Sequence, residues 1–393
     1  MKRVLSLFAA LFIAAGLFAQ NVTPGGAEGI TIEGYVSATA FIQNQTFAFG
    51  NGQEAEWAIP PVHSTNRWFA GMDVRNTTLR LLFNGRKKEG RKWSFGGALE
   101  MDFFGGYVGT SLFAAQMPVP RLVVAYMDMV HKNLRIRLGQ GYTPLVGNIP
   151  VSLSHLGFPL GAGATGWVGW RFPGIYVYWG LNGTEHATKI RLDAAIFTGS
   201  WQGPGSTTNF LTAGHFGSPQ MELKLNFDAK KWSAYIVGHY DNKNMSPVNV
   251  AKDSTLTGLA AEAGIKFHSG GFLVQGNFYT GKNIGQDFGQ MTQIQEVAHD
   301  LSSYGGWLQV GYEIKKVGFY AFYGAEKVNR EDAMACFSSP RTKQSLYNFM
   351  LKYDVSPQVS VGTEWLHSSA TYAGNLDTVI PGDQMSFSVL YKF

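Results

Sequence analysis

Apolar side chains occupy every second position along much of this chain. In the stretch KWSFGGALEMDFF, one face carries only apolar side chains and glycine, namely Trp93, Phe95, Gly97, Leu99, Met101 and Phe103. The opposite face includes Glu100 and Asp102. Side chains alternate across a β-strand but not around a helix, so this pattern predicts a strand with one apolar and one polar face.

Sixteen segments of roughly ten residues, the length of a tilted membrane-spanning strand, share this pattern. They are residues 30–43, 73–84, 93–104, 121–130, 133–141, 168–180, 188–199, 219–228, 231–241, 256–268, 271–280, 305–315, 317–327, 344–353, 357–367 and 384–393. Short connections such as HK, DAK and SG alternate with long ones, including 44–72, 142–167, 281–304 and 368–383. This alternation is typical of a bacterial outer-membrane barrel. We therefore predict an all-β fold, a closed antiparallel transmembrane barrel of 16 strands with short periplasmic turns and long extracellular loops.

A soluble β-sandwich would also show alternation, but its strands average about five to six residues and their apolar faces share one core. Here the apolar faces carry Trp, Phe, Tyr and Leu over about ten residues, and the opposite faces carry ionised groups in mid-strand. A closed barrel in lipid covers the apolar faces and leaves no unpaired strand edge. The pattern therefore favours a membrane barrel.

The chain ends on an alternating stretch, MSFSVLYKF, with Met385, Phe387, Val389, Tyr391 and Phe393 on one face. A last strand that pairs with the first strand would close the barrel, and these side chains would then face lipid. Aromatic residues near predicted strand ends, such as Trp232, Phe267 and Phe272, are expected in the girdles at the membrane interface.

The N-terminal residues indicate that the protein is exported from the cytoplasm. Lys2 and Arg3 precede an apolar run that ends in a small-residue context after Ala19, which predicts a secretory signal peptide over residues 1–19 and one barrel domain over 20–393. Without the two cations of the signal peptide the formal charge falls from +5 to +3, which does not favour nucleic-acid binding. Charged residues make up only 15% of the chain, and its one cysteine, Cys336, has no partner for an internal disulfide.

Several motifs resemble those of a known superfamily. The ending YKF is similar to the C-terminal signal that barrel-insertion machinery recognises, which implies such a partner for Phe393. The stretches TTLRLLFNGRKKEGRKWSFGGALEMDFFG and RIRLGQGYTPLVGN resemble strands of the trimeric sixteen-stranded porins, especially the DcaP-like members. The resemblance implies an outer-membrane homotrimer, an inward-folded third loop and anionic or carboxylate solutes. DcaP-like porins often carry an N-terminal helical extension, for which residues 21–29 are too short.

If the apolar faces meet lipid, the alternate positions line the lumen. This reasoning predicts nine pore-lining residues: Arg80, Glu100, Asp102, Asp128, Arg135, Arg137, Arg171, Lys189 and Arg191. Cations are costly on a lipid face and permitted in an aqueous channel. We expect opposed basic and acidic walls that set a field across the pore and select for polar solutes. The alternative is that these charges only solvate the wall or pair with one another.

The connection at residues 142–166 is long and unusually apolar for a loop. We expect it to fold into the barrel and narrow the channel, although a loop that contacts another subunit would also explain it. Its GAGATG run, Gly161 to Gly166, matches a dinucleotide fingerprint by letter but lacks the required buried parallel strand and following helix. We find no catalytic motif and no metal-ligand spacing among the histidines, so we predict no catalytic residues, metal or cofactor.

These observations predict a porin of the bacterial outer membrane, a homotrimer that passes small hydrophilic solutes by diffusion and prefers anions. An outer-membrane barrel enzyme is a second possibility, and a non-conducting structural or adhesive barrel is a third. The enzyme would need a nucleophile beside a histidine at the outer strand ends, and the sequence offers no convincing pair.

Overall fold

The computed structural model describes residues 29–48, 50–60, 68–85, 90, 92–105, 118–183, 185–198, 216–244, 255–295 and 297–393. The predicted signal peptide, residues 1–19, lies outside these residues. Among the described residues, no helix is both long and apolar enough to cross a membrane.

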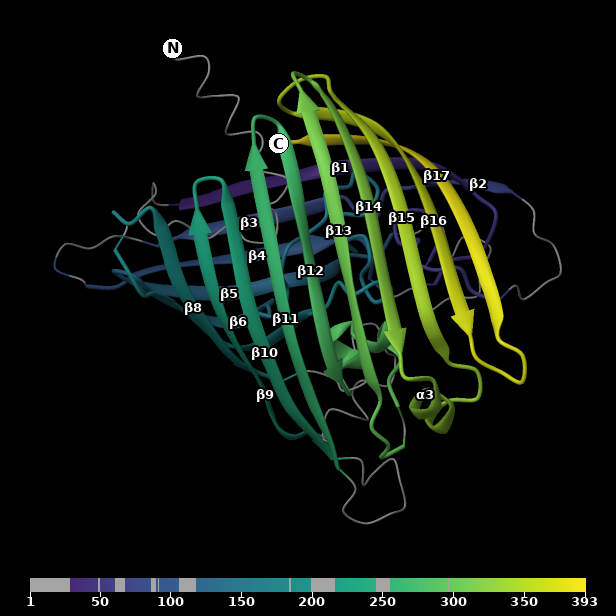
Figure 1. Cartoon of the computed structure of the whole chain (residues 1–393). Helices are drawn as coiled ribbons and strands as arrows, with labels where there is room; N and C mark the ends of the chain where they lie inside the picture. Colours follow the sequence, from purple (N-terminus) through teal and green to yellow (C-terminus); the bar gives the residue numbers. More distant parts are fainter. Residues whose placement is uncertain are drawn as a thin grey trace.

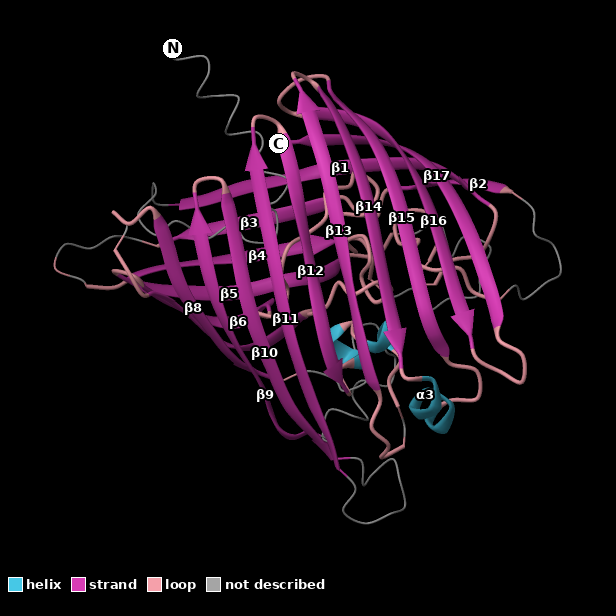
Figure 2. Cartoon of the chain, viewed as in Figure 1, coloured by secondary structure: helices cyan, strands magenta, loops and turns pink. Residues whose placement is uncertain are grey.

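Strands dominate the described part of the chain (Figure 2). They are β1 (Gly29–Gln43), β2 (Phe69–Asp73), β3 (Thr78–Asn84), β4 (Ser94–Asp102), β5 (Arg121–His131), β6 (Leu134–Tyr142), β7 (Arg171–Gly180), β8 (Thr188–Phe197), β9 (Phe216–Ala229), β10 (Trp232–Asn244), β11 (Thr255–Ser269), β12 (Phe272–Lys282), β13 (Ser302–Ile314), β14 (Val317–Val328), β15 (Arg341–Asp354), β16 (Val359–Tyr372) and β17 (Thr378–Lys392). In the same described part, three short helices lie in connections: η3 (Gly285–Asp287), η4 (Gln290–Thr292) and α3 (Arg330–Cys336).

The sheet closes on itself through β1. On one side β1 pairs antiparallel with β17, so that Ala38 lies opposite Val389. On the other side β2 pairs with the second half of β1, and β3 pairs with its first half. β2 and β3 are therefore two parts of one wall strand, and the barrel has 16 strands, which confirms the predicted fold class.

The break between β2 and β3 has a local cause. The Ser37 N–H of β1 donates to the Thr77 side-chain hydroxyl at 3.2 Å instead of to a ladder carbonyl. Asn76 turns inward, where its side chain donates to Ser154 O at 2.6 Å and accepts from Gly157 N at 2.8 Å. The predicted continuous strand 73–84 is interrupted here because the Asn76 side chain turns inward to bond the backbone of a loop inside the barrel.

Short turns join the strands at one rim, and long connections join them at the other (Figure 1). Between β11 and β12 the turn is Gly270 and Gly271, with φ values of 58° and 86°. Two consecutive positive φ values suit the twist of a tight hairpin, and only glycine adopts them without strain. The C-terminal end lies at this short-turn rim, whereas α3 lies at the opposite rim (Figure 1).

The outer surface of the barrel is apolar. The alternating side chains of the chain end, Met385, Phe387, Val389, Tyr391 and Phe393, are each 36–51% exposed. Trp232, Phe267 and Phe272 are exposed beside short turns, at 38–40%. Inward neighbours on β17, such as Gln384 and Ser388, are buried. An apolar exterior around a polar interior is the arrangement of a barrel placed in lipid.

Candidate functional site

The long connection between β6 and β7, residues 143–170, lies inside the barrel and is called the third loop below. Leu145, Leu160 and Trp167 of this loop are almost fully buried. Val151 and Gln309 of β13 exchange two hydrogen bonds of 2.7 and 2.8 Å, so the loop reaches the far wall. The loop is apolar because it packs inside the barrel and not at a wet rim.

Buried carboxylates hold the backbone of the third loop. Three project from the wall and one from the first long connection, and each accepts at least one loop N–H: Leu145 N to Glu222 at 2.6 Å, Leu153 N and Ser154 N to Glu364 at 2.7 and 2.8 Å, Gly161 N to Glu56 at 2.9 Å, and Gly166 N to Glu326 at 2.9 Å. Irregular backbone inside a protein needs such partners, because a buried N–H without an acceptor is costly.

The glycine-rich run of the third loop, Gly161 to Gly166, allows the backbone to form tight turns. Gly161, Gly163 and Gly166 have φ values of 85°, 62° and 84°, which strain other residues. A Cβ on Gly166 would lie 2.4 Å from the backbone nitrogen of Gly306 in β13. The glycines therefore let the loop turn and approach the wall closely, and the fingerprint-like letters GAGATG have a conformational explanation.

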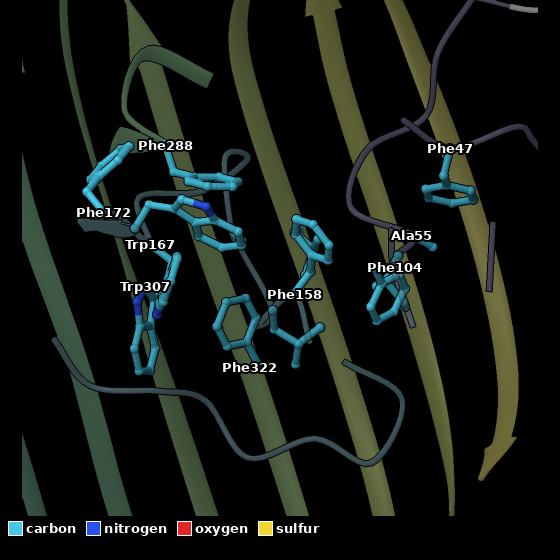
Figure 3. Close-up of a cluster of buried hydrophobic side chains, with 14 of the residues drawn as sticks. Phe47, Ala55, Phe104, Phe158, Trp167, Phe172, Phe288, Trp307 and Phe322 are labelled. Carbon is cyan, nitrogen blue, oxygen red and sulfur yellow. The ribbon is translucent and has the colours of Figure 1, made fainter. Parts of the chain in front are cut away.

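Aromatic side chains form a cluster in the middle of the barrel (Figure 3). Phe158 stacks on Trp170 with ring centroids 5.4 Å apart, and Trp170 meets Phe288 at 4.4 Å. Trp307 and Phe322 join the cluster from the wall strands β13 and β14. Phe288 belongs to the long connection between β12 and β13, so this connection also folds inward against the third loop.

Two ionisable groups are buried where the first long connection meets the third loop. His155 Nε2 donates to Ala55 O at 2.9 Å, so Nδ1 accepts from the Ser154 hydroxyl at 2.8 Å when the ring is neutral. Burial lowers the pKa of His155 below its ordinary value. Burial also raises the pKa of Glu56 well above its ordinary value, and the hydrogen bond from Gly161 N opposes this shift only in part.

The predicted pore-lining charges on β3 to β6 point inward and pair on neighbouring strands. Arg80 donates to Glu100 across β3 and β4 at 2.5 Å. Arg137 makes two hydrogen bonds to Asp128, of 2.8 and 3.0 Å, across β5 and β6. Acidic and basic residues therefore share one wall, and the expectation of opposed walls is wrong. The alternation of apolar and polar residues predicts that these side chains face the lumen. It does not show which strands lie opposite one another across the lumen.

The remaining predicted charges lie on the same side of the barrel. Arg191 pairs with Asp193 within β8 at 2.6 Å and is 40% exposed at its side chain. Lys189 is exposed near the short-turn end of β8. Arg135 approaches Asp128 at 3.9 Å, so Asp128 lies near two guanidinium groups. Arg171 is buried under Trp170, with its guanidinium carbon 4.0 Å from the ring centroid.

The third loop faces this wall through Arg121, which the sequence reasoning missed. Its guanidinium carbon lies 4.8 Å from the centre of the Phe158 ring, and it makes two hydrogen bonds to Asp102, of 2.9 and 2.6 Å. A bulge on β5 skips Val123 opposite β4, so the alternation changes phase there. Counting every second residue back from Asp128 therefore assigns Arg121 to the wrong face.

The carboxylates that hold the third loop were also missed, although their signal was present. Glu222 lies between the apolar residues Met221 and Leu223, and Glu364 lies beside the outward Trp365. Glu326 lies in phase with the inward residue Phe322 of the same strand. The same period-two reasoning used for the arginines would have assigned them to the lumen. Their role as acceptors for a loop far away in the sequence could not be read from that period.

Comparisons with known proteins agree with this geometry. No family model matches the chain, and no curated protein matches it in sequence. Among solved structures, the outer membrane channel DcaP of Acinetobacter baumannii has a TM-score of 0.68 at 15% identity, over 94% of this chain and 99% of that chain. OprB of Pseudomonas putida has a TM-score of 0.56 at 11% identity, over 93% and 94%. OmpT, an outer membrane protein of Vibrio cholerae, has a TM-score of 0.55 at 10% identity in its trimer form, over 93% and 100%. At these identities the likeness shows the fold, which is that of the outer-membrane porins.

Proposed function

We propose that this protein is a porin of the bacterial outer membrane through which small hydrophilic solutes diffuse. The observation that carries the proposal is the third loop, held inside the barrel by wall carboxylates and facing Arg121 through Phe158. A loop fixed in this way narrows the lumen to a passage lined on one side by arginines. The fold that the chain shares with DcaP supports the same function.

We further propose that the passage prefers anions, carboxylates among them. Asp128 lies between Arg135 and Arg137, at 3.9 and 2.8 Å. Among the described residues, no carboxylate oxygen lies within 4.0 Å of a nitrogen of Arg171. The wall of β5 to β7 therefore carries more positive than negative charge, and the low dielectric of the barrel wall focuses the field of these charges into the aqueous lumen, which attracts anions.

The assembly is proposed to be a homotrimer in outer-membrane lipid. The outer face of β1 carries Val36, Ala38 and Ala40, which are small enough for another barrel to pack closely. OmpT of Vibrio cholerae, which shares the fold, has a trimer form. Delivery to the membrane would use the barrel-insertion machinery, with Phe393 as the terminal aromatic residue of the recognised strand.

The experiment is single-channel recording of the purified protein in a planar bilayer with a KCl gradient. We expect conductance in steps of three, and we expect the sign of the reversal potential to show that the channel is anion-selective. Arg171→Gln and Arg135→Gln should each shift that potential toward zero. Arg330→Gln is the matched control, because Arg330 lies in α3 at the rim and pairs with Asp377 at 2.9 Å.

The outcomes separate the proposals. Firm cation selectivity would overturn the anion preference while leaving the channel. A reversal potential unchanged in both wall variants would overturn the assignment of that preference to Arg135 and Arg171. A folded, inserted protein without conductance would overturn the channel, and a structural barrel or a barrel enzyme would then be the better reading.

A further inference from the structure

A histidine and two carboxylates lie close together beside the two ends of the third loop. His239 on β10 lies directly opposite Glu222 on β9, and Asp287 approaches them from η3. All three side chains are completely buried. One ligand atom from each lies within 4.8 Å of the other two.

The distances suit a metal ion. His239 Nδ1 lies 2.9 Å from a Glu222 carboxylate oxygen, and His239 Nε2 lies 3.7 Å from an Asp287 oxygen. These contacts start from the two different ring nitrogens, of which only one can bind the ion. Ligand atoms about 2.0–2.1 Å from a tetrahedral ion are about 3.3 Å apart. One atom from each side chain lies within 4.8 Å of the other two, so the side chains must approach one another by up to about 1.5 Å to share one ion.

Asp287 supplies an independent indication of a missing ligand. Among the described residues, neither of its carboxylate oxygens has a hydrogen-bond partner, and both are buried. Within the same residues, the one ionic partner within 4.0 Å is the His239 ring, at 3.7 Å. A buried carboxylate without hydrogen bonds is costly, and such groups in proteins are normally paired or bound to a metal. Asp287 can also move toward an ion without breaking any hydrogen bond.

The charge balance points to a divalent ion. Lys243 donates to both oxygens of the nearby Asp241, at 2.5 and 2.7 Å, and so compensates that carboxylate. Asp241 also lies 3.3 Å from His239 Nε2, and Glu222 and Asp287 are the carboxylates that remain uncompensated beside the ring. Two carboxylates and a neutral imidazole carry a charge of minus two, which a divalent ion neutralises and a proton on the ring does not.

We propose that Glu222, His239 and Asp287 bind one divalent transition-metal ion, of which Zn²⁺ is the best representative. Imidazole suits Zn²⁺ and related ions, whereas Ca²⁺ and Mg²⁺ prefer sites made only of oxygen. No spacing in the sequence indicated the site, because its ligands come from two strands and a distant connection.

The ion would tie the third loop to the wall. Glu222 accepts the Leu145 N–H at the start of the loop at 2.6 Å. The backbone oxygen of Asp287 accepts the Gly169 N–H at the end of the loop at 2.7 Å. Both ends of the loop are thus attached to metal ligands, so occupancy of the site would restrict the loop. Binding itself does not depend on whether the barrel conducts.

The test is calorimetric titration of the full-length, EDTA-treated protein in detergent with ZnCl₂. We expect one saturable site per chain, and at least a tenfold weaker affinity in both Asp287→Asn and His239→Gln. Asp287→Asn is nearly isosteric and removes no hydrogen bond of the folded protein. Glu56→Gln is the control, because Glu56 is another buried carboxylate that holds the third loop but lies outside the site.

Wild-type affinity in both ligand variants, or the absence of saturable binding, would overturn the proposal. Crystals of the unaltered protein soaked in ZnCl₂ give a second test that does not require any variant to fold. An anomalous peak between the three side chains would support the site. A peak only at other histidines would overturn it.

Discussion

Gly34 and Phe393 exchange two backbone hydrogen bonds, with nitrogen–oxygen distances of 3.3 and 3.1 Å. They lie at the seam where the last strand meets the first, next to the pair formed by Tyr35 and Lys392. The other side of Gly34 faces Leu79 of β3. Gly34 is therefore in contact with both strands that close the ring.

A side chain at Gly34 should weaken that closure. The Cβ of Gly34→Ala would lie 2.2 Å from the backbone oxygen of Thr78 and 3.1 Å from the Phe393 ring, so the backbone must shift. Overpacking of this kind costs about 1–3 kcal/mol of unfolding free energy, to be measured by denaturant unfolding in lipid vesicles. Gly238→Ala is the matched control, because its Cβ meets only Ala260 O at 3.9 Å. Equal stabilities of the two variants would contradict the role of the seam.

The third loop should become mobile when its anchor on β16 is altered. Glu364 accepts from Leu153 N and Ser154 N with one oxygen, and from the Ser152 hydroxyl and the Asn348 amide with the other. In Glu364→Gln an amide NH₂ group replaces one carboxylate oxygen. In either orientation of the side chain this group faces a hydrogen-bond donor, so at least one hydrogen bond is lost. Each hydrogen bond lost to a charged acceptor costs about 1.5–3 kcal/mol of unfolding free energy. We expect larger fluctuations of the open-channel current in bilayer recordings.

Glu313→Gln is the control for that experiment. Glu313 on β13 bonds Tyr320 on β14 and Lys352 on β15, and not the third loop. Current noise that rises equally in both variants would mean that wall charge, and not loop anchoring, sets the fluctuations.

Acidification should loosen the contact between the first long connection and the third loop. Burial lowers the pKa of His155 from its ordinary 6.5, so the unfolded chain binds the proton more readily than the folded one. The stability that the neutral ring contributes is therefore present above about pH 6.5 and is lost as the pH falls below it. His155→Gln retains a donor for Ala55 O and an acceptor for Ser154 without titrating. Unfolding free energies between pH 8 and pH 5 should fall more steeply in the wild type, and parallel curves would refute this assignment.

The wall of the barrel could be predicted from the sequence because lipid imposes a period of two on the outward residues. The ends of the strands could not be predicted in this way, because the strands continue beyond the lipid, where no apolar exterior is required. β16 extends to Tyr372, five residues beyond the predicted segment 357–367, through the sequence SSATY. β17 likewise begins at Thr378, before the predicted start at residue 384.

The interior of the barrel was only partly predictable. The third loop was recognised by its apolar residues, which have no stable place at a wet rim. The connection between β12 and β13 folds inward too, yet its sequence NIGQDFGQMTQ resembles an exposed loop. Its buried polar groups are satisfied by long-range partners, as where Gln286 donates to Asp241 at 2.6 Å. Such contacts join residues far apart in the chain and leave no local pattern.

Removing one ring from the aromatic cluster should widen the proposed passage. Phe158 packs between Trp170 and Phe104, with centroids 5.4 Å away in both cases, and its face meets Arg121. Phe158→Ala should raise the single-channel conductance and admit larger sugars in liposome swelling, at a stability cost of about 3–5 kcal/mol typical of a buried phenylalanine. Phe278→Ala removes the same ring from the outer surface, where Phe278 is 56% exposed, and should leave conductance unchanged. If Phe158→Ala folds and conducts like the wild type, the narrowest part of the channel does not lie between the third loop and Arg121.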